Sequence, residues 1–213
     1  MSSRATVIIA DDHTLVAQAC QKLLEREFDV VAIVGDGRAL IRNAVALKPD
    51  VIIIDIHMPL LNGLDAGQQI SKILPHTKLV YSTMNPDPDL AAEAFRRGAS
   101  GYLLKTSAAS DILVAVRQVL KDEPFISPGI VREAIEGKTA GATPADEADP
   151  LTARQREVLQ LLAEGKAMKQ VAAVLNLTTR TVAFHKYRIM EALNIASDAE
   201  IVRYALKHHV LSA

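Results

Sequence analysis

Short apolar runs alternate with stretches of helical spacing along the first 120 residues. Val51 to Ile54 is the clearest run, since four consecutive β-branched residues are typical of a strand buried on both faces. Such runs predict strands at residues 6–10, 30–34, 51–54, 78–82 and 101–105, with helices at 14–27, at a segment ending near 47, and at 63–74, 87–97 and 110–121. Five repeats of strand and helix predict an α/β fold, a doubly wound five-stranded parallel sheet with helices on both faces.

The first and fourth of these helices carry features that can be compared with a structure. In the segment 14–27, Leu15, Ala19, Leu23 and Leu24 form one apolar stripe, which we expect to face the sheet. Gly98 follows the fourth helix and fits a glycine that ends a helix. The loop before that helix, residues 85–89, holds two prolines, which restrict its backbone and leave open a stiffer loop or a changed helix surface.

Polar side chains gather at the carboxyl ends of the predicted strands. The first strand ends on Asp11 and Asp12, the third on Asp55, the fourth on Ser82 and the fifth on Lys105. These ends share the edge where open α/β sheets bind ligands. Asp55 alone could simply cap a strand, but three carboxylates brought together repel one another and require a cation, for which Mg²⁺ is the best match. The hydroxyl and the ammonium suit the oxygens of a phosphoryl group on Asp55.

The last part of the chain shows helical spacing only. Helices are predicted at 152–164, 168–175, 178–193 and 198–208, with Thr152 as the first N-cap. On the third helix, Val182, Ile189 and Leu193 face inward and the outer face is basic. Two short helices joined by a tight turn describe a helix-turn-helix, although a generic small helical bundle has the same spacing.

The segment between these two regions has a different composition. Residues 138–150 lack apolar periodicity and are rich in small, acidic and proline residues, which predicts a flexible linker. Just before it, apolar residues at helical spacing predict a short linker helix at 128–136. We therefore predict a first domain at 1–123, a linker helix and flexible linker at 124–150, and a smaller all-α domain at 151–213.

Charge divides along the same boundaries. Residues 1–127 carry a net charge of −2, residues 128–150 a net charge of −3 and residues 151–213 a net charge of +4. The basic region is consistent with a nucleic-acid partner, although solvated helices are often basic. Cys20 is the only cysteine, which excludes an intrachain disulfide and a cysteine-based zinc site. Without an apolar run of membrane-spanning length or a signal-peptide core, the chain is expected to be cytoplasmic.

The residues at the strand ends match a known pattern. Asp11-Asp12, Asp55-x-x-Met58-Pro59, Ser82 and Gly101-Tyr102-x-x-Lys105 resemble the flavodoxin-like receiver domain of two-component response regulators, over about residues 4–122. The resemblance implies that Asp55 is the phosphoacceptor and that Mg²⁺ is held by Asp11, Asp12, Asp55 and the main-chain carbonyl of His57. It further implies that Ser82 and Lys105 contact the phosphoryl oxygens, while Tyr102 changes rotamer on activation.

The C-terminal helices match a second pattern. Leu151-Thr152-x-Arg154-x-x-Glu157-Val158-Leu159, Gly165, Lys169-Gln170-Val171-Ala172, Leu175-Asn176 and Thr181-Val182-x-x-His185 resemble the LuxR-type DNA-binding domain. A receiver joined to this domain is the arrangement of the NarL/FixJ family. The expected DNA-binding residues are Lys169, Thr179, Arg180, Ala183, Phe184, Lys186, Tyr187 and Arg188. The four cations are expected to contact phosphates, which position the protein without specifying sequence.

The combined resemblance implies a transcription regulator. A histidine kinase would phosphorylate Asp55, and phosphorylation would control homodimerisation and binding to half-sites in double-stranded DNA. A phosphohydrolase that uses an aspartyl-phosphate is a first alternative, but it would carry a second acidic residue two positions after the nucleophile, where this chain has His57. A regulator that binds DNA without phosphorylation is a second alternative, which the complete acidic site disfavours.

Overall fold

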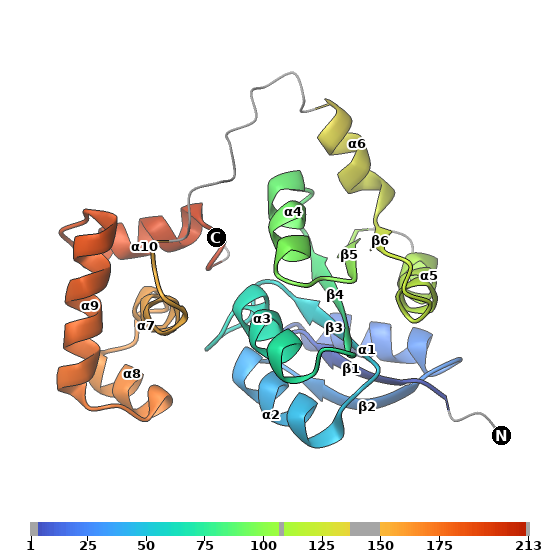
Figure 1. The fold of residues 1–213 in the computed structure, drawn as a ribbon, viewed down its shortest axis with the longest axis horizontal. Coiled ribbons are helices and arrows are strands. Elements are labelled where there is room, and N and C mark those ends of the chain that lie inside the picture. The colour runs from blue at the N-terminus through green and yellow to red at the C-terminus, as the bar shows by residue number, and fades with distance from the viewer. Residues whose placement is uncertain (1–3, 107–108, 137–149, 212–213) are drawn as a thin grey trace. The chain divides into compact units, whose positions relative to one another are not determined.

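The computed structural model describes residues 4–106, 109–136 and 150–211. The chain splits into two compact units, one built mainly from the residues up to 136 and the other mainly from residues 150–211 (Figure 1). Of the predicted flexible linker, only Pro150 lies among the described residues, so that interpretation stays a prediction. The predicted linker helix is present as α6, Pro128–Glu136.

A parallel sheet forms the centre of the N-terminal unit. Its strands are β1 (Thr6–Ala10), β2 (Asp29–Val34), β3 (Val51–Asp55), β4 (Lys78–Thr83), β5 (Gly101–Leu104) and β6 (Phe125–Ile126). They pair in the order β2-β1-β3-β4-β5-β6, and every pair is parallel. The doubly wound α/β prediction is confirmed, but the prediction of five strands is wrong because the sheet has six. β6 has only two residues, too few to show an apolar alternation in the sequence.

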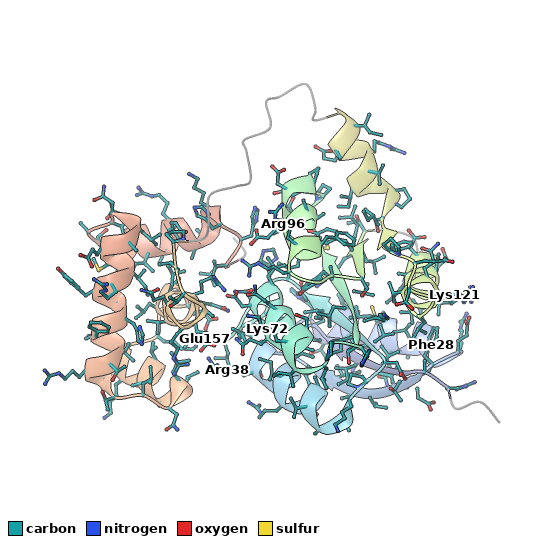
Figure 2. The ribbon with its side chains drawn as sticks, viewed as in Figure 1. Phe28, Arg38, Lys72, Arg96, Lys121 and Glu157 are labelled. Carbon is teal, nitrogen blue, oxygen red and sulfur yellow. The ribbon has the colours of Figure 1, made fainter. Side chains whose placement is uncertain are left out.

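Helices cover both faces of this sheet. They are α1 (Thr14–Leu24), α2 (Gly37–Leu47), α3 (Gly63–Ile73), α4 (Pro88–Arg96) and α5 (Ala109–Val119). α1 and α5 lie side by side on one face, and α2, α3 and α4 cover the other (Figure 1). Side chains fill the layers between sheet and helices, and Phe28 lies at the margin of the layer beneath α1 and α5 (Figure 2). Strand residues alternate between the two layers because successive side chains point to opposite faces.

Half of the apolar stripe predicted for α1 is wrong. Leu24 is buried and Leu23 packs against the same core, but Leu15 has 82% of its surface exposed and Ala19 is also exposed. Ala17 is buried against the sheet instead, and Cys20 packs beside it. The buried side chains are thus three and four residues apart but start at Ala17 rather than Leu15. The sequence contains apolar residues on both sides of this helix, so spacing alone did not select the inner face.

The segment 85–89 contains the start of α4, which begins one residue after its predicted start at 87. Pro88 is the first residue of α4 itself, a position where a proline costs no helical hydrogen bond. Asp87 caps the helix, since its carboxylate accepts hydrogen bonds from the Asp89 and Leu90 amides at 2.9 and 3.4 Å. Gly98 follows the helix with φ of +100°, in agreement with its predicted role. Pro86 is therefore the one proline of this segment that lies outside the helix.

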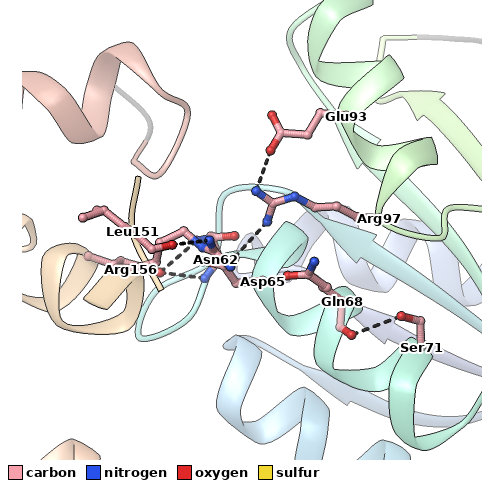
Figure 3. A network of polar contacts seen from close by, with 9 residues as sticks. Asn62, Asp65, Gln68, Ser71, Glu93, Arg97, Leu151 and Arg156 are labelled. Carbon is pink, nitrogen blue, oxygen red and sulfur yellow. Dashed lines mark hydrogen bonds and ion pairs between the residues drawn. The ribbon is translucent and has the colours of Figure 1, made fainter. Parts of the chain in front are cut away.

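An ion pair joins α3 to the end of α4 (Figure 3). The Arg97 guanidinium lies 2.9 Å from the buried Asp65 carboxylate and 2.5 Å from the Glu93 carboxylate. Beside it, Gly67 of α3 lies directly over Tyr81 of β4, so closely that a Cβ at position 67 would be 2.0 Å from the Tyr81 hydroxyl. The absence of a side chain at Gly67 therefore lets α3 approach β4.

The Tyr81 hydroxyl is buried and has no hydrogen-bond partner among the described residues. Because burying an unsatisfied hydroxyl costs free energy, we expect Tyr81→Phe to leave the free energy of unfolding unchanged or to raise it by about 1 kcal/mol. Urea unfolding of the two proteins would measure this. A loss of more than about 1 kcal/mol would show that the hydroxyl has a stabilising partner.

Ser127 connects the end of the sheet to α6. Its amide donates to the Tyr102 carbonyl at 2.9 Å, and its hydroxyl accepts from the Leu104 amide at 3.0 Å. The next residues begin α6, where Ile130 is buried and where Gly129 packs against Leu104. α6 also contacts α4. The segment that leaves the N-terminal unit is thus bound to β5 through both main-chain and side-chain hydrogen bonds.

The C-terminal unit consists of four helices, as predicted. They are α7 (Ala153–Ala163), α8 (Met168–Leu175), α9 (Thr179–Leu193) and α10 (Asp198–Lys207). Val182 and Ile189 of α9 are fully buried, and Leu193 packs against the same core, so the predicted inner face is confirmed. Thr152 caps α7 in a capping box with Gln155, as predicted, and Thr178 caps α9.

The turn between α8 and α9 is fixed by two local features. Asn176 adopts a left-handed conformation with φ of +53° that ends α8. Arg154 of α7 donates a hydrogen bond to the Leu175 carbonyl at 2.7 Å and pairs with Glu157 at 2.6 Å. A cation at the last carbonyls of a helix stabilises that end.

Among the described residues, no helix has the length and apolar character required to cross a membrane.

Candidate functional site

The parallel strands bring the predicted acidic residues to one edge of the sheet. Asp11 follows β1 directly, and Asp55 is the last residue of β3. Carboxylate oxygens of Asp11, Asp12 and Asp55 lie within 4.8 Å of one another, together with an imidazole nitrogen of His13. Asp55 is only 3% exposed, and Asp11 is also buried. This donor set of three carboxylates fits a hard divalent cation such as Mg²⁺.

Lys105 lies between two of these carboxylates. Its Nζ is 2.8 Å from Asp11 Oδ2 and 2.9 Å from Asp55 Oδ2, and all three side chains are at most 7% exposed. Burial raises the pKa of Asp55, although the nearby ammonium opposes the shift. Burial alone would lower the pKa of Lys105, but its hydrogen bonds to Asp11 and Asp55 reverse this and leave its pKa raised. The lysine therefore remains charged and partly neutralises the acidic cluster.

The predicted switch residues occupy the neighbouring strands. Ser82 is paired in register with Asp55 and is buried at the same edge. Tyr102 of β5 is fully buried, and burial raises the pKa of its hydroxyl. Thr83, next to Ser82, is also fully buried, and its hydroxyl accepts a hydrogen bond from the Asn85 amide at 3.1 Å. Ser82 thus lies at the same sheet edge as Asp55 and its partner Lys105.

Two further residues at this edge were not predicted. The first is His13, whose Nδ1 lies 2.8 Å from the Asp12 carboxylate and 3.3 Å from that of Asp11. The second is Gly63, the first residue of α3, whose amide donates to the Ile56 carbonyl at 2.8 Å. A Cβ at Gly63 would lie 2.1 Å from the Asp55 carbonyl oxygen. In the sequence, the signal that could have identified Gly63 is a glycine eight residues after the candidate phosphoacceptor.

His57 follows the acceptor by two residues. Its amide donates to Asp55 Oδ1 at 3.3 Å, so the main chain turns back toward the carboxylate at this point. This turn is consistent with the predicted contribution of the His57 main chain to the cation site. That role stays a prediction.

The residues predicted to bind DNA lie mainly on one face of α9. Arg180, Ala183, Phe184, Tyr187 and Arg188 are exposed at helical spacing, and the exposed Thr179 begins the helix. Lys169 is exposed at the start of α8. These residues form one continuous helix face plus the N-terminal turn of the preceding helix, which is the geometry of a helix-turn-helix.

Two of the predicted phosphate contacts are held by carboxylates. Lys186 is only partly exposed and lies 2.5 Å from Asp198 at the start of α10, which turns it away from the face formed by Arg180 and Tyr187. Arg188 lies 2.7 Å from Glu191. An exposed ion pair contributes little free energy, so phosphate oxygens can replace these carboxylates.

Two family models match most of the chain. The model for the response regulator receiver domain matches residues 7–117, and the model for bacterial regulatory proteins of the luxR family matches residues 149–205. These ranges contain the sheet-edge cluster and the α8–α9 helix-turn-helix, respectively.

Several relatives match nearly the whole length of this chain. The oxygen regulatory protein NreC of Staphylococcus haemolyticus strain JCSC1435 is 35% identical, over 96% of this chain and 98% of that protein. NreC of Staphylococcus aureus strain bovine RF122 is 34% identical with the same coverage. Among solved structures, the RcsB response regulator of Salmonella typhimurium is 29% identical with a TM-score of 0.60, over 95% of this chain and 98% of that one. An RcsB–DNA complex is 28% identical with the same TM-score and coverage. The chain therefore belongs to the response regulators of the NarL/FixJ type, in which a receiver domain is joined to a LuxR-type DNA-binding domain that regulates transcription.

Proposed function

We propose that a histidine kinase phosphorylates Asp55 and that this phosphorylation controls DNA binding by α9. The observation that carries the proposal is the position of Asp55, a buried carboxylate within 2.9 Å of the Lys105 ammonium and close to two further carboxylates. A carboxylate can accept a phosphoryl group as a nucleophile. In this proposal the chain is a phosphoacceptor and not an enzyme, apart from slow loss of its own phosphoryl group.

Asp11, Asp12 and Asp55, with the His57 carbonyl, are the residues that would hold Mg²⁺. When bound, the ion supplies positive charge that offsets the charge of the transferring phosphoryl group. The protein itself excludes water from Asp55 by burial and orients the carboxylate through the His57 amide and the Lys105 ammonium. Positioning of this kind contributes much of the catalysis in phosphoryl transfer.

Phosphorylation changes the hydrogen-bond acceptors available at the sheet edge. The phosphoryl group adds a charge of about −1.5 to −2 and three acceptor oxygens. Lys105 then exchanges its contact with Asp11 for phosphoryl oxygens, and Ser82 offers its hydroxyl from the adjacent strand. Tyr102 changes rotamer as β4 and β5 adjust. The new charge thus shifts a two-state equilibrium toward the active form.

The active form is proposed to be a homodimer that places two α9 helices on half-sites of double-stranded DNA in the cytoplasm. Paired half-sites suit a dimer because its two-fold symmetry matches that of the DNA. Structures of RcsB dimers bound to DNA support this proposal. The same face of α9 carries the exposed Arg180 and the apolar side chains that could enter the major groove.

The phosphorylation switch can be tested with beryllofluoride, which forms a complex with a working acceptor carboxylate. We expect light scattering to show a shift from monomer to dimer when beryllofluoride and Mg²⁺ are added to the wild-type protein. Asp55→Asn should show no shift, because its amide cannot form the complex. A dimer in Asp55→Asn under the same conditions would contradict the assignment of Asp55. Unchanged monomer in both proteins would instead favour DNA binding without phosphorylation, or release of the DNA-binding domain without dimerisation of the receiver.

A further inference from the structure

The DNA-facing surface of α9 has an unusual apolar centre. Phe184 is 60% exposed and Tyr187 is 67% exposed, and the two lie three residues apart on the same face with Ala183 beside them. A single exposed apolar side chain is ordinary, but two exposed aromatic rings three residues apart on one helix face favour a partner that covers them. The ring of Phe184 makes an edge contact with His185, with centroids 5.9 Å apart, which limits its freedom before binding.

Side chains that could make bidentate hydrogen bonds to a base are scarce at the middle of this face, where Tyr187 offers a single hydroxyl. Lys186 is turned toward Asp198, and Arg188 is paired with Glu191. Ala183 and Phe184 offer neither a donor nor an acceptor on their side chains. Arg180 lies one turn earlier, near the start of the helix. The middle of α9 is therefore poorly suited to read a base through bidentate hydrogen bonds, which usually come from arginine, lysine, asparagine or glutamine.

We infer that Phe184 and Tyr187 select DNA through contact with the 5-methyl groups of thymine. This inference rests on the proposed function of α9 as the DNA-reading helix. The thymine methyl is the apolar group that a base pair presents in the major groove, and aromatic and small apolar side chains pack against it. Phe184 and Tyr187 thus specify thymine positions in each half-site, while Arg180 and Lys169 contact the phosphates.

The test uses the full chain activated with beryllofluoride and Mg²⁺. Duplexes that it binds are first selected from a random library, and each thymine of the selected half-site is then replaced singly by uracil, which lacks only the methyl group. Burial of one methyl group contributes about 0.8 kcal/mol, so we expect uracil at one or two positions to weaken binding about fourfold. The affinity is measured by fluorescence anisotropy at fixed salt.

A double-mutant cycle, which combines a protein variant with a uracil-substituted duplex, identifies the side chain that contacts each thymine methyl group. In Phe184→Ala or Tyr187→Ala, uracil at the matching position should have no further effect, because the contact is already absent. Phe184→Leu, which keeps an apolar side chain, should retain part of the uracil effect. Ile135→Ala, which truncates an equally exposed apolar residue of α6, should keep the full uracil effect.

The possible results distinguish a failure of the thymine inference from a failure of the proposed DNA-binding role of α9. If the wild-type protein binds a selected duplex but no uracil substitution weakens binding, the inference is overturned and the DNA-binding role of α9 stands. A uracil effect that persists unchanged in both alanine variants also overturns it. If no duplex is selected, and Arg180→Ala does not change binding to random DNA, the proposed role of α9 fails as well.

Discussion

Gly63→Ala is expected to destabilise the N-terminal unit by about 3 kcal/mol and to abolish phosphorylation of Asp55. A Cβ at this position would lie 2.1 Å from the Asp55 carbonyl oxygen and 2.9 Å from Ile54 Cγ2. Both contacts are with β3, which is fully buried, so the strand cannot move without disturbing its neighbours. The predicted displacement moves the phosphoacceptor itself, since Asp55 is the last residue of that strand. Urea unfolding and labelling by a small phosphodonor would measure the two effects.

Gly35→Ala is the matched control for this substitution. Gly35 also lies beside the acidic cluster, but the nearest atoms to its added Cβ are 3.8 Å away, at Asp12, and 3.9 Å away, at Asp11. These are ordinary contact distances, and we expect stability and phosphorylation close to those of the wild-type protein. If Gly63→Ala is as stable as Gly35→Ala, α3 and β3 can separate more easily than the buried packing indicates.

Lys105→Met is expected to lower the free energy of unfolding by about 3 kcal/mol in the absence of divalent cations, because it leaves Asp11 and Asp55 buried without their shared cation. Saturating Mg²⁺ should recover most of that loss, since the ion supplies the missing positive charge. The same substitution should raise the affinity for Mg²⁺ above that of the wild-type protein, where the ammonium competes for the same carboxylates. Urea unfolding with and without Mg²⁺, and titration calorimetry, would measure both.

Lys72→Met controls for the loss of a lysine at an exposed position, at the end of α3 (Figure 2). It should change neither the stability nor the response to Mg²⁺, because a solvated charge there contributes little. An equal response of the Lys105→Met and wild-type proteins to Mg²⁺ would show that the lysine and the ion do not compete. In that case the acidic cluster binds Mg²⁺ through groups that Lys105 does not contact.

The sequence was most informative where one apolar pattern stood out from its surroundings. The buried β-branched run at 51–54 defined the central strand, and the strand ends then placed Asp11, Asp55 and Lys105 at one edge, because the carboxyl ends of parallel strands share an edge. The inner face of α9 was likewise confirmed, since Val182, Ile189 and Leu193 recur at helical spacing and pack in the core. What could be predicted was the grouping of these side chains and not which atoms make contact.

Other features depended on tertiary packing that periodicity does not encode. The two-residue strand β6 is defined by its pairing with the edge of β5, and the inner face of α1 begins at Ala17, which packs in the core, rather than at Leu15. Lys186 was predicted among the cations that contact phosphates, yet in the structure it is paired with Asp198 of the next helix. The close approach of Gly63 to Asp55 is a contact between main-chain atoms, for which a lone glycine is only a weak sign.

The hydrogen bonds of Ser127 have a consequence for how this receiver can be combined with other proteins. Both of them hold the β5 main chain within three residues of Lys105, and the helix that follows carries the chain out of the unit. These hydrogen bonds attach the segment that leaves the unit to β5, the strand that ends beside the phosphorylation site. A foreign output domain joined after residue 136 would keep this connection, whereas one joined before residue 125 would lose it together with the edge strand. A fusion protein that reuses this receiver should therefore be joined after α6 rather than after the end of α5.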